Sequence, residues 1–105
     1  MTHQIIHKRR GEREVKAIAE AMISKLNEPQ NLVKGDWKDC EFDYLLKRAA
    51  EELIELEEAV EKWQRFKRRG LDVFTINEAA KEVLKEAADV ANFPMMIADK
   101  VGALE

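Results

Sequence analysis

Four acidic residues carry the chemistry that this sequence suggests: Glu52, Glu55, Glu86 and Asp89. They form two pairs with the spacing i, i+3, which on an α-helix brings the two Cβ atoms to about 5–6 Å. If the two helices pack at the usual axial separation of about 8–10 Å, all four carboxylates converge on one small volume. An empty cluster of this kind would repel itself and raise some of its pKa values. A hard divalent cation would relieve the repulsion.

The available ligand types narrow the choice of cation. Carboxylate and water oxygens alone favour Mg2+, for which Mn2+ is a possible substitute, or Ca2+. A di-iron bundle is disfavoured because such proteins use Glu-x-x-His motifs, and both histidines precede the first predicted helix. Ordinary ion pairs are an alternative use of the acids, because Arg48 lies four residues before Glu52 and Lys85 lies four before Asp89.

A helix over residues 12–26 is the first element predicted to support these acids. Apolar residues recur there at helical spacing, and Pro29 follows soon after the last of them. Residues 27–38 show no periodicity and predict a connecting loop, longer than the two to eight residues usual between bundled helices.

Two longer helices are predicted to carry the acid pairs. Asp39 is placed to cap the N-terminus of the second helix, residues 40–69, and Gly70 to end it. The sequence TINE, residues 75–78, has the pattern of a capping box and is predicted to open the third helix, which runs to about Asn92.

Helical wheels place the four acids beside the apolar stripes. The stripe of the second helix is Leu45, Ala49, Leu53, Leu56, Val60 and Trp63, and that of the third is Ala79, Val83, Ala87 and Val90. Glu52 and Glu86 border these stripes, and Glu55 and Asp89 follow them. Three other glutamates of the second helix lie further out and are predicted to be solvated: Glu51, Glu58 and Glu61.

Pro94 predicts a kink or a break after Asn92. Proline has no amide to donate to the Val90 carbonyl and disfavours helical geometry at Phe93. A final helical segment is expected to about Val101. Residues 90–98 are apolar almost all round, so we expect them in the interface of a homodimer or a dimer of dimers.

Composition predicts one all-α domain over residues 1–105, in which residues 1–11 form a loosely ordered extension. The chain is 46% hydrophobic and 37% charged with only four Gly and two Pro, which favours helices over strands. A net charge of -3 argues against nucleic acid as a partner. No apolar run is long enough for a membrane span, and the single Cys40 excludes an internal disulfide. A cytoplasmic location is therefore expected.

Two motifs resemble a known family. The sequences EELIE, residues 51–55, and EAAD, residues 86–89, resemble the E-E-x-x-E … E-x-x-D signature of the MazG-like, all-α nucleotide pyrophosphohydrolases. The similarity covers about residues 43–100 and is to the short single-domain members. It implies a compact helical bundle of the all-α NTP pyrophosphatase type with a long central second helix. It also implies Mg2+-dependent hydrolysis of an NTP or dNTP between the α and β phosphates, giving a monophosphate and pyrophosphate.

The resemblance also assigns roles to single residues. It implies that the metal ligands are Glu52, Glu55, Glu86 and Asp89. Phosphoryl-type displacement depends on positioning and charge neutralisation, so one carboxylate, Glu52 or Glu55, would also orient or deprotonate the attacking water.

Four further residues are candidate substrate contacts. Asn92, one turn after Asp89, is similar to the family's polar contact to the nucleotide, and Lys100 is placed to balance phosphate charge. Trp37 in the predicted loop and Trp63 on the second helix could stack on a base, although helical spacing favours Trp63 as a core aromatic.

Two other functions fit the same sequence. One is a non-catalytic helical interaction module, in which the acids form a solvated face and residues 93–97 bind a partner. The other is a phosphoribosyl-ATP pyrophosphatase on the same fold.

Overall fold

The computed structural model describes residues 11–32 and 35–105, so the predicted N-terminal extension, except for Gly11, lies outside the described residues. Its helices are, in chain order, α2 (Glu12–Leu26), α3 (Pro29–Leu32), the 3-10 helix η1 (Trp37–Asp39), α4 (Phe42–Arg68) and α5 (Val73–Lys100). The predicted all-α class is confirmed. No helix in this part of the chain is both long and apolar enough to cross a bilayer.

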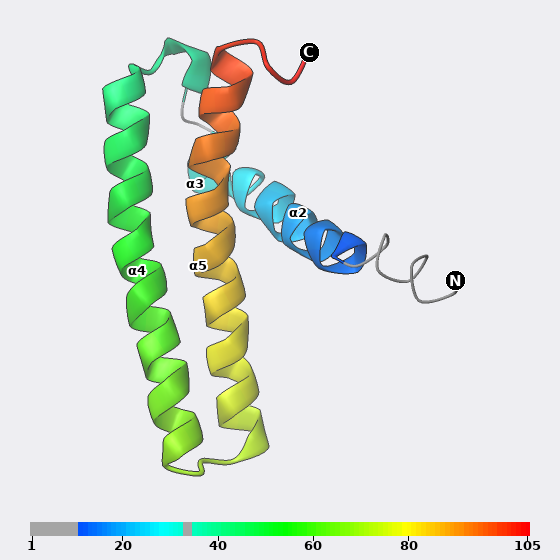
Figure 1. The fold of residues 1–105 in the computed structure, drawn as a ribbon, viewed down its shortest axis with the longest axis vertical. Coiled ribbons are helices and arrows are strands. Elements are labelled where there is room, and N and C mark those ends of the chain that lie inside the picture. Colours follow the sequence, from blue (N-terminus) through cyan, green and yellow to red (C-terminus); the bar gives the residue numbers. More distant parts are fainter. Residues whose placement is uncertain (1–10, 33–34) are drawn as a thin grey trace, which may run out of the picture.

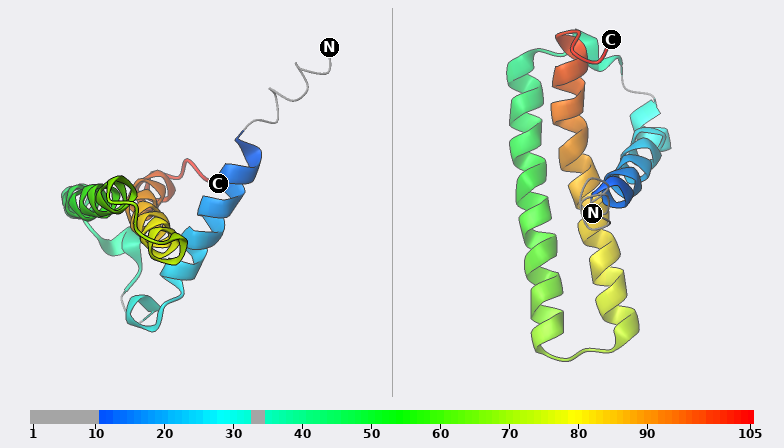
Figure 2. Two further views of the ribbon diagram at one scale, coloured as in Figure 1. Left: turned by 90° about the horizontal axis from the view of Figure 1, so that it is seen from below. Right: turned by 45° about the vertical axis from the view of Figure 1, so that its right-hand side comes forward.

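The two long helices form an antiparallel hairpin, and α2 lies across one side of it (Figure 1). Helix α2 packs against α5, and within the described residues it makes no comparable contact with α4. Figure 2 shows α2 standing out from the hairpin on the α5 side. Helix α2 is therefore attached to the hairpin through one of its two helices.

The turn between α4 and α5 is fixed by local backbone bonds. Gly70 has φ 65°, and its amide donates to the Lys67 carbonyl at 3.1 Å while the Leu71 amide donates to Phe66 at 3.2 Å. This pair of bonds is a Schellman motif, which favours glycine because a side chain is strained at positive φ. The prediction that Gly70 ends the helix over residues 40–69, which is α4, is confirmed.

The predicted N-caps of both long helices are wrong. Helix α5 begins at Val73 because the Asp72 carboxylate accepts a hydrogen bond from the Thr75 amide at 2.7 Å, so residues 75–78 lie inside the helix. Asp39 belongs to η1, which Asp36 caps through the Lys38 amide at 2.9 Å. The segment predicted as an unstructured loop thus contains α3 and η1, and α4 starts only at Phe42.

Helix α5 continues through Pro94 to Lys100 without interruption. Of the two predicted outcomes, a kink or a break after Asn92, the break is wrong. Proline removes one intrahelical hydrogen bond, whereas α5 packs against α4, α2 and η1 along its length. Tertiary packing therefore outweighs the local preference against helix at this position.

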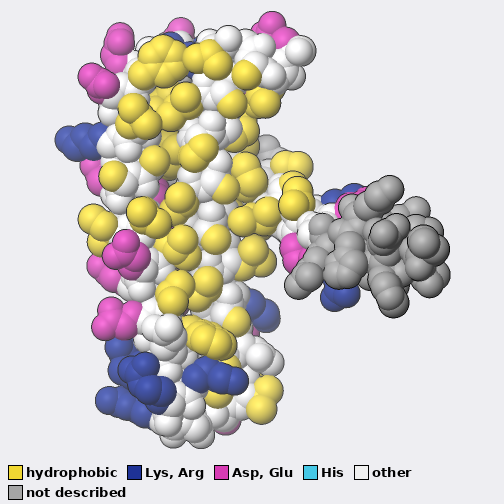
Figure 3. Space-filling view, in the orientation of Figure 1, with side chains coloured by type: hydrophobic (Ala, Val, Ile, Leu, Met, Phe, Trp, Pro, Cys, Tyr) yellow, Lys and Arg dark blue, Asp and Glu magenta, His cyan; other side chains and the backbone are white. Residues whose placement is uncertain are grey.

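The α4–α5 interface is narrow and differs from the predicted apolar stripe. The buried residues of α4 are Leu45, Glu52 and Ala59, which recur every seven residues, whereas Leu53 is 45% exposed. The fully buried residues of α5 are Ala79, Ala88 and Asn92. Glu52 consequently lies in the centre of the helix contact and not at its border. Figure 3 shows that many apolar side chains remain on the visible face of the hairpin.

Candidate metal centre

Three of the four predicted acids come together between the long helices. One carboxylate oxygen from each of Glu52, Glu86 and Asp89 lies within 4.8 Å of the other two. Glu52 projects from the centre of α4, and Glu86 and Asp89 occupy successive turns of α5. The predicted convergence is therefore present for these three side chains, which we call the carboxylate trio.

The trio is shielded from water. Glu52 is only 8% exposed, and the Asp89 side chain is 18% exposed. The Oε2 atom of Glu86 is buried and has no hydrogen-bond partner among the described residues. A buried carboxylate oxygen without a partner costs free energy, so the fold carries an unsatisfied anion at this point.

Burial and mutual repulsion shift the titration of all three acids in one direction. Burial raises the pKa of Glu52, helped by hydrogen bonding and repulsion from Glu55 and opposed by Arg48. Burial also raises the pKa of Glu86, with repulsion from Asp89 and Glu52 adding to the effect. The pKa of Asp89 rises because of burial, against the attraction of Lys25. The ionised form of each acid is thus disfavoured at its position.

Two cations of the chain partly offset the charge of the trio. Arg48 Nη2 donates to Glu52 Oε1 at 2.7 Å, so the predicted Arg48–Glu52 pair is formed. Asp89 pairs with Lys25 of α2, whose Nζ lies 3.3 Å from Asp89 Oδ2, and not with Lys85 as the alternative reading expected. Among the described residues Glu86 has no salt bridge of its own, although the attraction of Lys25 opposes the rise of its pKa.

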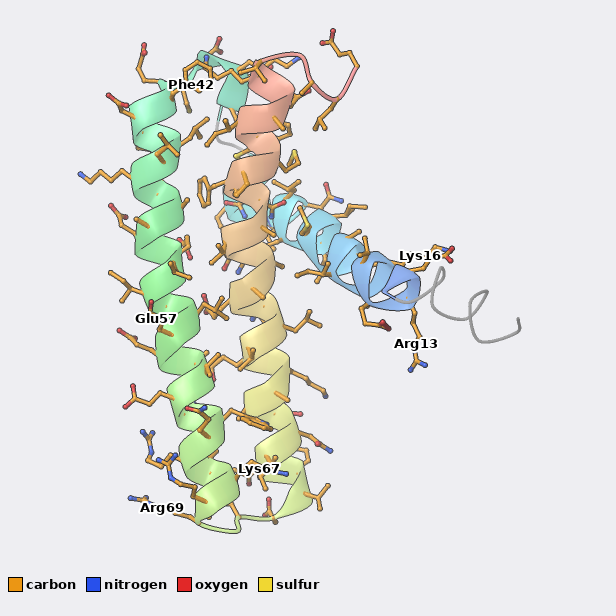
Figure 4. The ribbon with its side chains drawn as sticks, in the orientation of Figure 1. Arg13, Lys16, Phe42, Glu57, Lys67 and Arg69 are labelled. Carbon is orange, nitrogen blue, oxygen red and sulfur yellow. The ribbon has the colours of Figure 1, made fainter. Side chains whose placement is uncertain are left out.

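Glu55 lies at the rim of this centre. Its side chain is exposed and is not one of the three within 4.8 Å, although it contributes to the raised pKa of Glu52. It lines an open groove of about 340 Å³ next to the trio. The remaining lining residues are Glu58, Ala59, Lys62, Glu82 and Glu86. Glu58, predicted to be solvated, is exposed but borders the same groove, whereas Glu57 lies on the outer side of α4 (Figure 4).

Asn92 is buried beneath α2, one turn beyond Asp89. It is 3% exposed, and its Nδ2 donates to the Met22 carbonyl at 3.4 Å. Its Oδ1 is buried without a partner among the described residues. The residue predicted to contact a nucleotide is therefore adjacent to the trio, but α2 covers it.

The other three predicted contacts lie far along the hairpin from the trio. Trp37 Nε1 donates to Asp99 at 2.9 Å, and Lys100 Nζ donates to the Lys38 carbonyl at 2.8 Å. These bonds fasten η1 to the end of α5, about 15 Å from Asp89 at the helical rise of 1.5 Å per residue. Trp63 is half-buried near the other end of the hairpin. Their predicted roles stay predictions, and the structure does not bring them to the carboxylates.

Comparison with known proteins gave no match. Neither the models of protein families, nor the curated proteins, nor the solved structures matched this chain. The resemblance of the two acidic motifs to a known family therefore stays a prediction, and the geometry of the site has to carry the functional assignment.

That geometry fits a hard divalent cation. Mg2+ is held by oxygen ligands at about 2.0–2.1 Å, so neighbouring ligands of an octahedron lie about 2.9 Å apart and opposite ligands about 4.2 Å apart. The oxygens of the trio, within 4.8 Å of one another, lie near this range and would draw closer together around a cation. The partnerless Glu86 Oε2 offers a lone pair that the described residues leave unused. A cation here would offset the burial cost of all three acids together.

Proposed function

We propose that this chain is a Mg2+-dependent nucleoside triphosphate pyrophosphohydrolase of the MazG-like type. It would hydrolyse an NTP or dNTP between the α and β phosphates to a monophosphate and pyrophosphate. The observation that supports this most is the carboxylate trio, which is partly buried, short of cations and formed by acids of the two motifs. Mn2+ would be expected to substitute for Mg2+.

The proposed roles follow from where each side chain lies. Glu52, Glu86 and Asp89 would hold the cation. When bound, Mg2+ would neutralise phosphate charge and lower the pKa of the attacking water. Of the two candidates for orienting or deprotonating that water, the placement favours Glu55, because it is exposed at the groove whereas Glu52 is buried and paired with Arg48.

Product analysis across a nucleotide panel tests the assignment. The protein is incubated with NTPs, dNTPs, modified nucleotides and phosphoribosyl-ATP, in Mg2+ or in chelator. We expect a monophosphate and pyrophosphate from at least one nucleoside triphosphate, only in Mg2+. Cleavage of phosphoribosyl-ATP alone would support the alternative pyrophosphatase. Release of orthophosphate and a diphosphate, or no cleavage of anything, would contradict both.

Exposed apolar surface supports the further proposal of a homodimer or dimer of dimers. Leu45 is the only large side chain that is fully buried in the described chain. Leu46, Leu53 and Ile54 of α4 are 56%, 45% and 56% exposed. Within residues 90–98, predicted as the interface, only Pro94 is exposed, so the available apolar face lies on α4 instead. Surfaces of this kind mark interaction sites, a point that also favours the interaction-module alternative.

Light scattering decides the assembly. We expect at least twice the chain mass of 12.2 kDa for the wild type and a smaller species for Leu53→Lys, because a lysine there would charge the proposed interface. Lys47→Gln, on the same helix but polar already, is the control and should keep the wild-type mass. A 12.2 kDa wild type at micromolar concentration would refute the assembly.

A further inference from the structure

Helix α2 contacts the hairpin through α5. It has no fully buried residue, and it packs against α5 alone of the two long helices. Two polar contacts tie its C-terminal end to α5. Lys25 pairs with Asp89, and the Met22 carbonyl accepts from Asn92. Both polar contacts thus lie next to the carboxylate trio.

Lys25 is the only cation that α2 supplies to the trio. Its Nζ lies 3.3 Å from Asp89 Oδ2 and 3.5 Å from Glu28 Oε1, and its side chain is 21% exposed. Lys25 therefore serves as a counter-ion of Asp89.

A divalent cation would compete with this lysine. A cation bound by Glu52, Glu86 and Asp89 would stand within a few ångströms of the Lys25 ammonium group, in a partly buried site where charges interact strongly. It would also bind the Asp89 carboxylate, and so weaken the attraction between Asp89 and Lys25. Linkage makes the effect mutual: cation binding weakens the Lys25–Asp89 pair by the same factor by which the formed pair weakens cation binding.

The helix that carries Lys25 also contacts Asn92. The Asn92 Nδ2 donates to the Met22 carbonyl of α2, and its Oδ1 is buried without a hydrogen-bond partner among the described residues. We propose that Lys25 is a latch that holds α2 over Asn92 while the carboxylate trio lacks a divalent cation, and that cation binding at Asp89 releases it. This inference rests on the proposed cation site and names how that site would be opened to substrate.

Calorimetric titration with Mg2+ alone tests the competition. Lys25→Gln should bind Mg2+ at least about fivefold more tightly than the wild type, because the competing charge is gone. Lys16→Gln is the matched control, since Lys16 lies on α2, is 73% exposed and, among the described residues, pairs with Glu12 alone, and the net charge changes equally. The Lys16→Gln protein should bind Mg2+ as the wild type does, and the affinity of Lys25→Arg for Mg2+ should stay close to that of the wild type.

Hydrogen exchange of the wild type tests the release without any substitution. The amides of α2 should exchange faster in saturating Mg2+ than in chelator, whereas amides in the middle of α4 should not. Unchanged protection of α2, or Lys25→Gln binding no more tightly than Lys16→Gln, overturns the latch while leaving the cation site in place. If the wild type binds no Mg2+ in the calorimeter, the proposed function itself fails, and the latch fails with it.

Discussion

Two aspartates on the same helix behave in opposite ways. Asp72 begins α5 in full solvent, and its hydrogen bond to Thr75 lowers its pKa. Asp89 lies seventeen residues later between helices, and burial raises its pKa. The first acid stabilises the fold by being charged, and the second destabilises it. An acid whose charge is opposed by the fold fits the cation proposed for this site.

The largest expected difference between the two positions is in activity. Asp89→Asn should lower Mg2+-dependent pyrophosphate release by at least about 100-fold, because a ligand and its charge are lost together. Asp72→Asn makes the same chemical change on the same helix and should keep most of the wild-type rate. Initial rates at saturating nucleotide measure both variants. Equal rates for the two would remove Asp89 from the site.

Substitutions in the two regions should change the stability of the metal-free protein in opposite directions. In chelator, Asp72→Ala should melt below the wild type because the N-cap is lost. Glu86→Gln should melt at or above it, because the amide removes a repelling charge that has no cationic partner. Asp89→Asn should gain less, since it also loses the Lys25 pair. Thermal melts by circular dichroism give the order, and a Glu86→Gln protein that melts well below the wild type would make this acid structural.

A smaller effect is expected in the pH dependence of stability. Because the folded-state pKa values of Glu52, Glu86 and Asp89 are raised, the folded protein binds more protons than the unfolded chain between the ordinary and the raised values. Stability from these groups therefore falls as pH rises through that window. For Asp72, with a lowered pKa, stability is instead lost as pH falls below its ordinary value.

Melting temperatures in chelator at about pH 5 and pH 7 test this sign. Glu86→Gln should lose less stability than the wild type between the two values, since one of the three raised groups no longer titrates. Asp72→Asn should change as the wild type does, because Asp72 is ionised in both states over this range. A Glu86→Gln protein with the wild-type pH dependence would mean that the Glu86 carboxylate is not repelled.

Local signals in the sequence predicted the hairpin well and the attachment of α2 poorly. The bounds of α2 and the role of Gly70 follow from helical periodicity and from the need for positive φ, both of which act within a few residues. The N-cap at Asp72 was missed because the capping-box pattern three residues later competes for the same start. Two candidate N-caps with equally favourable local sequence can be distinguished only by how the helix packs in the fold.

The candidate site shows the same limit. The i, i+3 spacing accounts for Glu86 and Asp89 lying together, since helix geometry fixes it. Glu52 joins them through the packing of α4 on α5, and its own i+3 partner Glu55 stays outside the trio. Glu52 was expected at the border of its stripe because the wheel assumes 3.6 residues per turn, whereas α4 meets α5 with a repeat of seven. No pattern in the sequence indicated that Lys25 would lie at the site. Its pairing with Asp89 depends on how α2 crosses α5, and no spacing within one helix contains that information.

The most direct test of the account compares melting temperatures in Mg2+ and in chelator. The proteins are the wild type, Glu86→Gln and, as a control from the outer side of α4, Glu57→Gln. A ligand that binds only the folded state at one hundred times its Kd stabilises it by about 2.7 kcal/mol, which raises the melting temperature of a chain this size by about 10 °C. We expect such a rise for the wild type and Glu57→Gln and little or none for Glu86→Gln. No rise in the wild type, or an equal rise in all three proteins, would contradict a cation site at the carboxylate trio.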